Sequence, residues 1–328
     1  MGRSAGFQPA LNFSALQPTR MVAIFVICFA LLLTSDAPSL AETKSASPSL
    51  VSLAPSNTEL LLDVGARELL GGVCTNCPQV LPNADEKLKN IPIVGTFVTA
   101  NLERLTRIKP QSVLLVSGQE AIAHMLNMRG FNVVVLKNDK LSDIPENLRR
   151  IGKLCRKEER ADALSRRFNL AKKELNAIIS GATSKPKVFY CTWAQPLLTI
   201  GKNSFLNDVI TTCGGTNIAA QMSQPYPHFS AERLIVADPD IVILPYDARE
   251  QGLAKRFPWN KLRAIKNKKL FYSPPPREDM LSRPAMGVLD GLYWMSLKLH
   301  PELEEPLGKW HARFMEKTLR KSPASSKG

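Results

Sequence analysis

Two cysteines have a spacing that could support chemistry. Cys74 and Cys77 are separated by two residues, as in redox motifs and metal half-sites. A zinc site would need two more ligands, and the chain has only four histidines. They are His124, His228, His300 and His311. No thioredoxin-like context surrounds the pair. We therefore favour a local disulfide or two small core-side thiols, with an exported thiol or redox protein as the alternative.

The sequence contains no recognisable catalytic constellation. It has no G-x-S-x-G nucleophile motif, no phosphate-cradling glycine loop and no H-E-x-x-H metal motif. Asp238 and Asp240 flank Pro239 at the start of a strand, where turn carboxylates are common. We predict no catalytic residue, no bound metal and no resident cofactor, so the chain is expected not to be an enzyme.

Two glutamates occupy the same place in a repeated unit. Residues 101–116 and 230–245 share a pattern of Glu-Arg-Leu, a proline five residues later and a final apolar run. The matched pairs are Glu103/Glu232, Arg104/Arg233, Leu105/Leu234, Pro110/Pro239, Val113/Val242 and Leu115/Leu244. Each unit predicts a short amphipathic helix, a proline turn and a buried strand. One copy in each half predicts two similar lobes.

Both glutamates are predicted to lie on the solvent side of their helices. Leu102, Leu105 and Ile108 share one face of the first helix, which leaves Glu103 outside it. Glu232 is likewise off the face formed by its apolar neighbours. Such a glutamate can simply stabilise the helix start, by under about 1 kcal/mol. It can also be recognised by a partner.

The elements around these residues alternate between strands and helices, which is typical of parallel sheets. Residues 50–142 predict a first α/β lobe. Its strands are expected at 50–53, 71–73, 113–116 and 131–136. A helix is expected to start near Thr58, capped by Ser56 or Asn57, and a loop is expected at 75–84. Residues 185–312 predict a second lobe. Its strands are expected at 187–191, 241–244 and 269–272, and its helices at 204–212 and 286–299. Trp193 is expected in a loop after the first of these strands. Residues 313–328 predict a basic, disordered tail.

A helical stretch separates the two lobes. In residues 143–181, apolar side chains recur every three or four residues along one face. Gly152 is expected to divide a short helix from a longer one. The longer helix, from Lys157 to Ser180, would be about 36 Å long. Its position between the two repeat copies favours a rigid connector between lobes.

The first 41 residues have the order of an export signal. Arg3 and Arg20 precede an apolar run from 21 to 33, and a small-residue stretch ends at Ala41. The run is shorter than the about 20 residues that span a bilayer comfortably, which favours a cleaved signal over the alternative, an uncleaved anchor. Ile27 before Cys28 argues against lipid attachment. Export also argues against nucleic acid as the partner of this basic chain, whose formal charge is +14.

Six segments of the chain resemble one family in order. VSLAPSNTELLLDVGARELLGGV resembles the opening of class III substrate-binding proteins of ABC importers, which serve cobalamin, ferric siderophores and haem. The other five are VGTFVTANLERLTRIKPQSVLLV, LLTIGKNSFLNDVITTCGGTNI, YPHFSAERLIVADPDIVIL, WNKLRAIKNKKLFYSP and SRPAM. The resemblance runs from about Leu50 to Leu299, and the chain is most similar to the cobalamin-binding branch.

The resemblance implies two α/β lobes with mainly parallel sheets, joined by one long rigid helix, with a ligand cleft between them. By position, Phe97 and Tyr226 replace tryptophans of the cobalamin-binding member, and Trp193 lies near another aromatic position. Asn76 replaces a tyrosine, and Val116 a further tryptophan. The ligand-binding residues so implied are Pro55, Ser56, Asn76, Phe97, Trp193, Tyr226, Phe229, Asp279 and Arg283. Broad apolar walls of this kind suit a large ring ligand.

Other ligands of the same family remain open. Haem would use a Tyr or His ligand to iron, for which Tyr226 and His228 are the obvious pair. A ferric siderophore is anionic and would need convergent Arg or Lys. The resemblance also implies a disulfide from Cys213 to the closing helix, but 291–294 read Gly-Leu-Tyr-Trp, so that bridge cannot form.

The resemblance gives the two glutamates a role. In the family, one carboxylate at each lobe tip docks onto arginines of the permease, which implies permease docking by Glu103 and Glu232. The expected partners are an inner-membrane ABC permease and a small-molecule ligand, with no nucleic acid. The expected protein is a periplasmic monomer.

Overall fold

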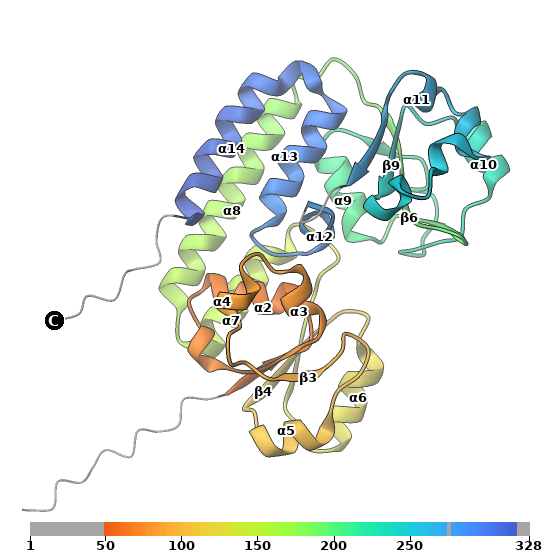
Figure 1. Ribbon diagram of the computed structural model, residues 1–328. Helices are drawn as coiled ribbons and strands as arrows, with labels where there is room; N and C mark the ends of the chain where they lie inside the picture. Colours follow the sequence, from red (N-terminus) through yellow and green to blue (C-terminus); the bar gives the residue numbers. More distant parts are fainter. Residues whose placement is uncertain (1–48, 274–276, 320–328) are drawn as a thin grey trace, which may run out of the picture. The chain divides into compact units, whose positions relative to one another are not determined.

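The computed structural model describes residues 49–273 and 277–319 (Figure 1). The predicted export signal, residues 1–41, lies outside this range, and so does the whole proline run 274–276 before Arg277. The described residues form two mainly parallel sheets with helices between the strands, which confirms the predicted α/β class. None of the described helices is both long enough and apolar enough to cross a membrane.

The first sheet has the strand order β3-β2-β1-β4-β5, and every neighbouring pair is parallel. Its strands are β1 Leu50–Ser52, β2 Leu70–Cys74, β3 Ile93–Gly95, β4 Ser112–Val116 and β5 Val133–Leu136. Its helices are α2 Pro55–Asp63, α3 Asn76–Val80, α4 Ala84–Lys87, α5 Leu102–Ile108 and α6 Glu120–Met128, with a 3-10 turn η1 at Arg67–Leu69. The order reverses between β1 and β4. Ligands of open α/β sheets bind beyond the carboxyl ends of the strands at such a point.

The second sheet has the order β10-β9-β6-β7, and β8 also pairs with β6. Its strands are β6 Lys187–Ala194, β7 Leu197–Thr199, β8 Thr216–Asn217, β9 Ile241–Pro245 and β10 Leu270–Ser273. Only the β6–β7 pair is antiparallel among the described strand pairs. The helices are α9 Phe205–Thr212, α10 Ala231–Ala237 and α11 Arg263–Lys266, with 3-10 turns η2 Tyr246–Arg249, η3 Leu253–Lys255 and η4 Trp259–Lys261.

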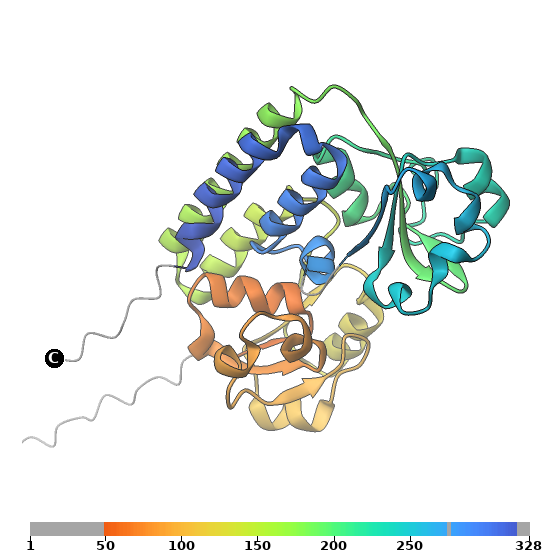
Figure 2. The same ribbon diagram turned by 45° about the horizontal axis from the view of Figure 1, so that its top comes forward.

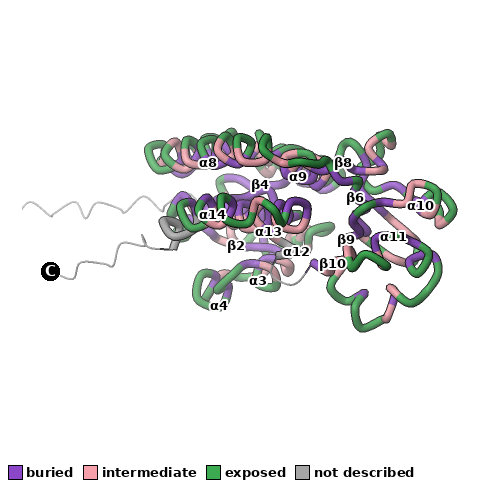
Figure 3. The backbone as a smooth tube through the Cα atoms, turned by 90° about the horizontal axis from the view of Figure 1, so that it is seen from above, coloured by how far each residue is buried: buried purple, intermediate pink, exposed green. Residues whose placement is uncertain are grey.

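The remaining helices flank the sheets. They are α7 Asp143–Cys155, α8 Glu158–Ile179, α12 Arg277–Ser282, α13 Val288–Leu299 and α14 Glu304–Leu319, with η5 at Pro301–Leu303. Helices α8, α13 and α14 run side by side (Figures 1 and 2). The indole of Trp310 donates to the carbonyl of Ala171 at 2.9 Å and fastens α14 to α8. Strands β1 and β4 are buried along their whole length, and so are residues 241–244 of β9 (Figure 3).

The helical connector, residues 143–181, differs from the prediction in where its first helix ends. Gly152 lies inside α7, and the helix ends instead at Cys155, before Arg156, which has a positive φ of 55°. A Cβ on Gly152 would lie 2.4 Å from the Cβ of Ala161. The glycine therefore serves the close packing of α7 on α8 rather than a helix end. The long helix itself spans 22 residues, close to the predicted range.

Four other predictions were wrong in detail. Neither Ser56 nor Asn57 caps α2, because Pro55 occupies the first turn and the helix begins after Ala54. The expected loop at 75–84 contains the helix α3. Trp193 lies within β6, which extends three residues beyond the expected end. Residues 313–319, expected in the tail, continue α14.

Candidate functional site

The two repeat units have the same local structure. Asn101 caps α5 by accepting from the backbone N–H of Arg104 at 2.9 Å, and Ser230 caps α10 by accepting from that of Arg233 at 3.1 Å. Each helix ends on a residue with positive φ, Lys109 at 51° and Asp238 at 36°. A proline and a buried strand follow in both cases. The predicted helix, turn and strand are confirmed in both copies.

The two glutamates are exposed in the first turn of these helices, but their surroundings differ. Glu103 forms an exposed ion pair with Arg107 four residues later, at 2.9 Å. Glu232 has no ion-pair partner among the residues that the structure describes, since Val236 stands at the corresponding position. Its own backbone N–H and the Ser230 hydroxyl hold the pKa of the Glu232 carboxyl below its usual value. Glu232 is therefore available to an external cation as it stands, whereas Glu103 already has Arg107 as its partner.

One buried glutamine organises the carboxyl edge of the first sheet. The Gln119 amide donates to the carbonyls of Leu53, at 3.1 Å, and Phe97, at 2.5 Å. Its oxygen accepts from the N–H of Val116 at 2.9 Å. The loops after β1, β3 and β4 are thereby joined at the switch point. Phe97, held in this way, keeps 37% of its surface exposed.

Other residues implied by the resemblance lie at the same edge. Pro55 and Asn76 are half-buried, at the starts of α2 and α3. Ser56 is buried in the first turn of α2, and Val116 is buried in β4. The carboxyl ends of β1, β2 and β3 therefore bring Pro55, Asn76 and Phe97 to one edge of one sheet.

The second sheet presents two exposed aromatic residues. Trp193 in β6 is 56% exposed, and its indole donates to the carbonyl of Gln195. Tyr226 is 57% exposed, and partial burial together with the negative charge of Asp139 raises its hydroxyl pKa. Asp139 belongs to the segment between β5 and α7, so Tyr226 lies within electrostatic reach of a residue from the first half.

The segment around Tyr226 runs antiparallel to β7. Thr199 donates to the carbonyl of Pro227 at 3.1 Å, and Phe229 donates to that of Leu197 at 3.0 Å. Alternate residues therefore face opposite sides, with Tyr226 and His228 exposed and Pro227 buried. Phe229 is only 6% exposed and packs on Phe189 at 5.4 Å between ring centroids. Its side chain belongs to the core in this structure.

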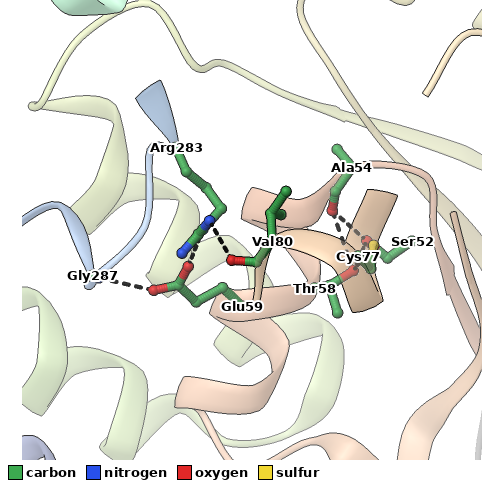
Figure 4. A network of polar contacts seen from close by, with 8 residues as sticks. All are labelled: Ser52, Ala54, Thr58, Glu59, Cys77, Val80, Arg283 and Gly287. Carbon is green, nitrogen blue, oxygen red and sulfur yellow. Dashed lines mark hydrogen bonds and ion pairs between the residues drawn. The ribbon is translucent and has the colours of Figure 1, made fainter. Parts of the chain in front are cut away.

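Arg283 is also held in the interior. Its guanidinium forms an ion pair with Glu59 of α2 and donates to the carbonyl of Val80 at 3.0 Å (Figure 4). The same glutamate accepts from the N–H of Gly287 at 2.9 Å. Arg283 and Glu59 are 5% and 12% exposed. The pair ties α2 and α3 to the segment between α12 and α13. The side chain of Asp279 lies outside the described residues.

A second carboxyl group stands one turn after Glu59. Burial, and then the negative charge of Glu59, raise the pKa of Asp63 to about 8. One of its oxygens is buried without a hydrogen-bond partner among the described residues. A protonated Asp63 beside the Glu59–Arg283 pair avoids placing two buried carboxylates on one helix face.

The cysteines are not arranged as an accessible reactive centre. Cys74 and Cys77 are both fully buried, with their sulfurs 3.3 Å apart. Within the described residues, no group of three or more His, Cys, Asp or Glu side chains could hold a metal ion.

A surface cavity of about 500 Å³ lies away from these positions. Its lining includes Leu102, Lys109, Arg129 and Phe131, near the amino ends of β4 and β5. None of the predicted ligand residues lines it. The carboxyl ends of the strands, where ligands of open α/β sheets bind, lie at the opposite edge of the first sheet.

Sequence reasoning missed Gln119, Glu59 and Asp63. Gln119 follows the end of a predicted strand, a position where polar residues often act, and this signal was available. The partner of Glu59 is 224 residues away in the sequence, so no local pattern reveals the pair.

Three comparisons place the chain among known proteins. A family profile described as periplasmic binding protein matches residues 50–276. A vitamin B12-binding protein of Salmonella typhimurium is 30% identical over 207 residues, covering 62% of this chain and 75% of that protein.

Two solved structures share the fold. The periplasmic vitamin B12 binding protein BtuF of Vibrio cholerae has a TM-score of 0.68 and 21% identity, covering 81% of this chain and 98% of that one. A periplasmic heme binding protein from Pseudomonas aeruginosa has a TM-score of 0.66 and 24% identity, covering 77% and 92%. The two-lobed α/β architecture is therefore shared by proteins named for different ligands.

Proposed function

The chain belongs to the periplasmic binding protein family, the class III substrate-binding proteins of ABC importers, and on this premise we propose that it captures cobalamin or a related corrinoid. Membership implies an exported protein without catalysis that delivers a small ligand to a membrane permease. The choice of a corrinoid is supported by the vitamin B12-binding relatives, which are similar to this chain over most of their length.

One observation carries the proposal. Phe97, Trp193 and Tyr226 are large aromatic residues left exposed, and each belongs to a loop or strand end beside a sheet. Covering an exposed aromatic side chain with a ligand is favourable, and flat rings suit the face of a corrin. Asn76 would supply a polar contact at the first sheet. Pro55 and Ser56 would shape the same edge. Phe229 would support Tyr226 from the core, and Arg283 would hold the α12–α13 segment in place.

A second ligand is favoured by a specific observation. Tyr226 and His228 are both exposed on one side of the strand-like segment beside β7, because Pro227 and Phe229 face the other side. Two such side chains can serve iron as ligands. Haem is therefore the alternative ligand, and a ferric siderophore has no comparable support in the described residues.

The two exposed glutamates support delivery to a permease. Glu103 and Glu232 occupy the same position in two structurally equivalent helices. We propose that each binds an arginine of the permease, which would fix the orientation of the protein on its partner. Glu103 would first have to release Arg107, whereas Glu232 is free of that competition.

Intrinsic fluorescence can test the ligand directly. Of the four tryptophans, only Trp193 is exposed, while Trp259, Trp294 and Trp310 are buried. Residues 42–328 should be titrated with cyanocobalamin, haemin and a ferric siderophore, following fluorescence and heat. We expect cobalamin to bind with a dissociation constant below about 1 µM. Micromolar or weaker binding of cobalamin, together with tight binding of another ligand, would overturn the assignment.

A further inference from the structure

Cys74 and Cys77 form a contact that the ligand proposal does not use. Cys74 is the last residue of β2, and Cys77 lies in the first turn of α3. Their sulfur atoms are 3.3 Å apart, in hydrogen-bonding contact. Both side chains are fully buried. A disulfide bond would need a sulfur–sulfur distance of about 2.05 Å, so a movement of about 1.3 Å would close it.

We propose that Cys74 and Cys77 form a disulfide bond in the exported protein, clamping the start of α3 to the end of β2. The proposal rests on the export that the family implies, because disulfides form and persist in the bacterial periplasm. It does not depend on which ligand is bound. Among the described cysteines, Cys155, Cys191 and Cys213 make no sulfur–sulfur contact.

The chemistry balances with a disulfide oxidant, such as a thiol oxidoreductase or glutathione disulfide. The Cys74 thiolate attacks one sulfur of the oxidant, forms a mixed disulfide and releases one thiolate. Cys77 then loses its proton and attacks the Cys74 sulfur, which forms the internal bond and releases the second thiol. Two protein thiols are oxidised and one disulfide is reduced to two thiols. Because both sulfurs are buried in the folded chain, the exchange takes place before α3 packs.

In the packed, reduced chain the two thiols share one hydrogen bond. It lowers the pKa of Cys74 to about 7 and raises the pKa of Cys77. The hydroxyl of Thr58 lies 3.1 Å from the Cys77 sulfur (Figure 4). It donates its one hydrogen to Ser52 Oγ at 2.8 Å, so it can accept from the Cys77 thiol of the reduced pair.

The clamp would act on the proposed ligand site through α3. Asn76 lies between the two cysteines, and the carbonyl of Val80 at the end of the same helix accepts from Arg283. Fixing the first turn of α3 would thus hold Asn76 and support the tie to the α12–α13 segment.

Thiol counting tests the proposal on ligand-free protein. The full chain is expressed, purified from the periplasm without reductant, denatured and treated with N-ethylmaleimide. We expect three labelled cysteines in the mature chain, and a peptide spanning 74–77 that is about 2 Da lighter than its reduced form, because a disulfide lacks the two hydrogen atoms of the thiols. Reduction before labelling should give five. Five labelled cysteines without reduction, or a bridge between other residues, would overturn the proposal.

The melting temperature provides an independent test of the disulfide. Closing so short a loop should raise the melting temperature by about 4 °C, because the constraint on the unfolded chain is small and the chain is long. Dithiothreitol should remove this gain in the wild type and change nothing in the Cys74→Ser/Cys77→Ser variant. A reductant effect of the same size in that variant would contradict the assignment. Loss of cobalamin binding in a protein that still contains the bridge would count against the proposed function alone.

Discussion

The buried ion pair between Arg283 and Glu59 gives the sharpest stability prediction. Replacing Arg283 with Met would leave the Glu59 carboxylate 12% exposed, with only the Gly287 N–H as a described hydrogen-bond donor. It would also remove the donor to the Val80 carbonyl. Removing one partner of a buried pair costs about 3–5 kcal/mol.

We therefore expect Arg283→Met to lower the free energy of unfolding by about 4 kcal/mol, of which about 1 kcal/mol is the lost Val80 hydrogen bond. For a chain of this length the melting temperature should fall by about 8 °C. Urea unfolding of the mature chain measures the first quantity, and calorimetry measures the second.

A double-mutant cycle separates the pair from its surroundings. Glu59→Leu/Arg283→Met removes both charges, so it should recover most of the loss. Lys309→Met is the matched control, because Lys309 forms an ion pair with Glu305 at 2.7 Å on an exposed helix face. That change should have no measurable effect. A cost below about 1 kcal/mol for Arg283→Met would refute the role of the tie.

Three further predictions concern pH, transport and ligand contact. The folded pKa of Asp63, about 8, lies above its ordinary 3.8, so its stabilising contribution is fully present below about pH 4 and is lost as the pH rises through 8. Asp63→Asn should therefore gain more melting temperature over the wild type at pH 8.5 than at pH 5, because the loss grows between the two pKa values; equal differences at both would contradict the shift. The double variant Glu103→Ala/Glu232→Ala should bind ligand normally but fail to support ligand uptake by cells. The control Glu120→Ala, at another exposed helix start, should support uptake, and uptake by the double variant would contradict the docking proposal. Trp193→Ala should weaken cobalamin binding at least about tenfold by calorimetry, because an exposed wall is removed; unchanged affinity would exclude Trp193 from the site.

Local patterns predicted the fold well where a single element carries the signal. The repeated helix, proline turn and strand was evident because its caps and buried residues lie within 16 residues of each other. The long helix α8 was evident for the same reason. Gly152 was misread because a glycine that ends a helix and a glycine that admits a neighbouring helix look alike in sequence. Ser56 and Asn57 were misread because Pro55 can begin a helix as readily as precede one.

The candidate site was less predictable because its supports are distant in sequence. The amide of Gln119 joins loops that begin at Leu53 and Phe97, 66 and 22 residues away. Phe229 and Arg283 have the residue types of ligand contacts, yet packing on Phe189 and pairing with Glu59 bury them. Whether a side chain faces a ligand or the core depends on such contacts, which only the folded chain reveals.

The central claim is that this binding protein carries a corrinoid, and direct identification of the ligand tests it most directly. Protein purified from cells supplied with cobalamin should be examined by native mass spectrometry, without added ligand. We expect one cobalamin per chain, displaced by excess cyanocobalamin and retained in the Glu103→Ala/Glu232→Ala variant. Haem at the same stoichiometry, with no cobalamin, would contradict the claim and identify Tyr226 and His228 as the residues to test next.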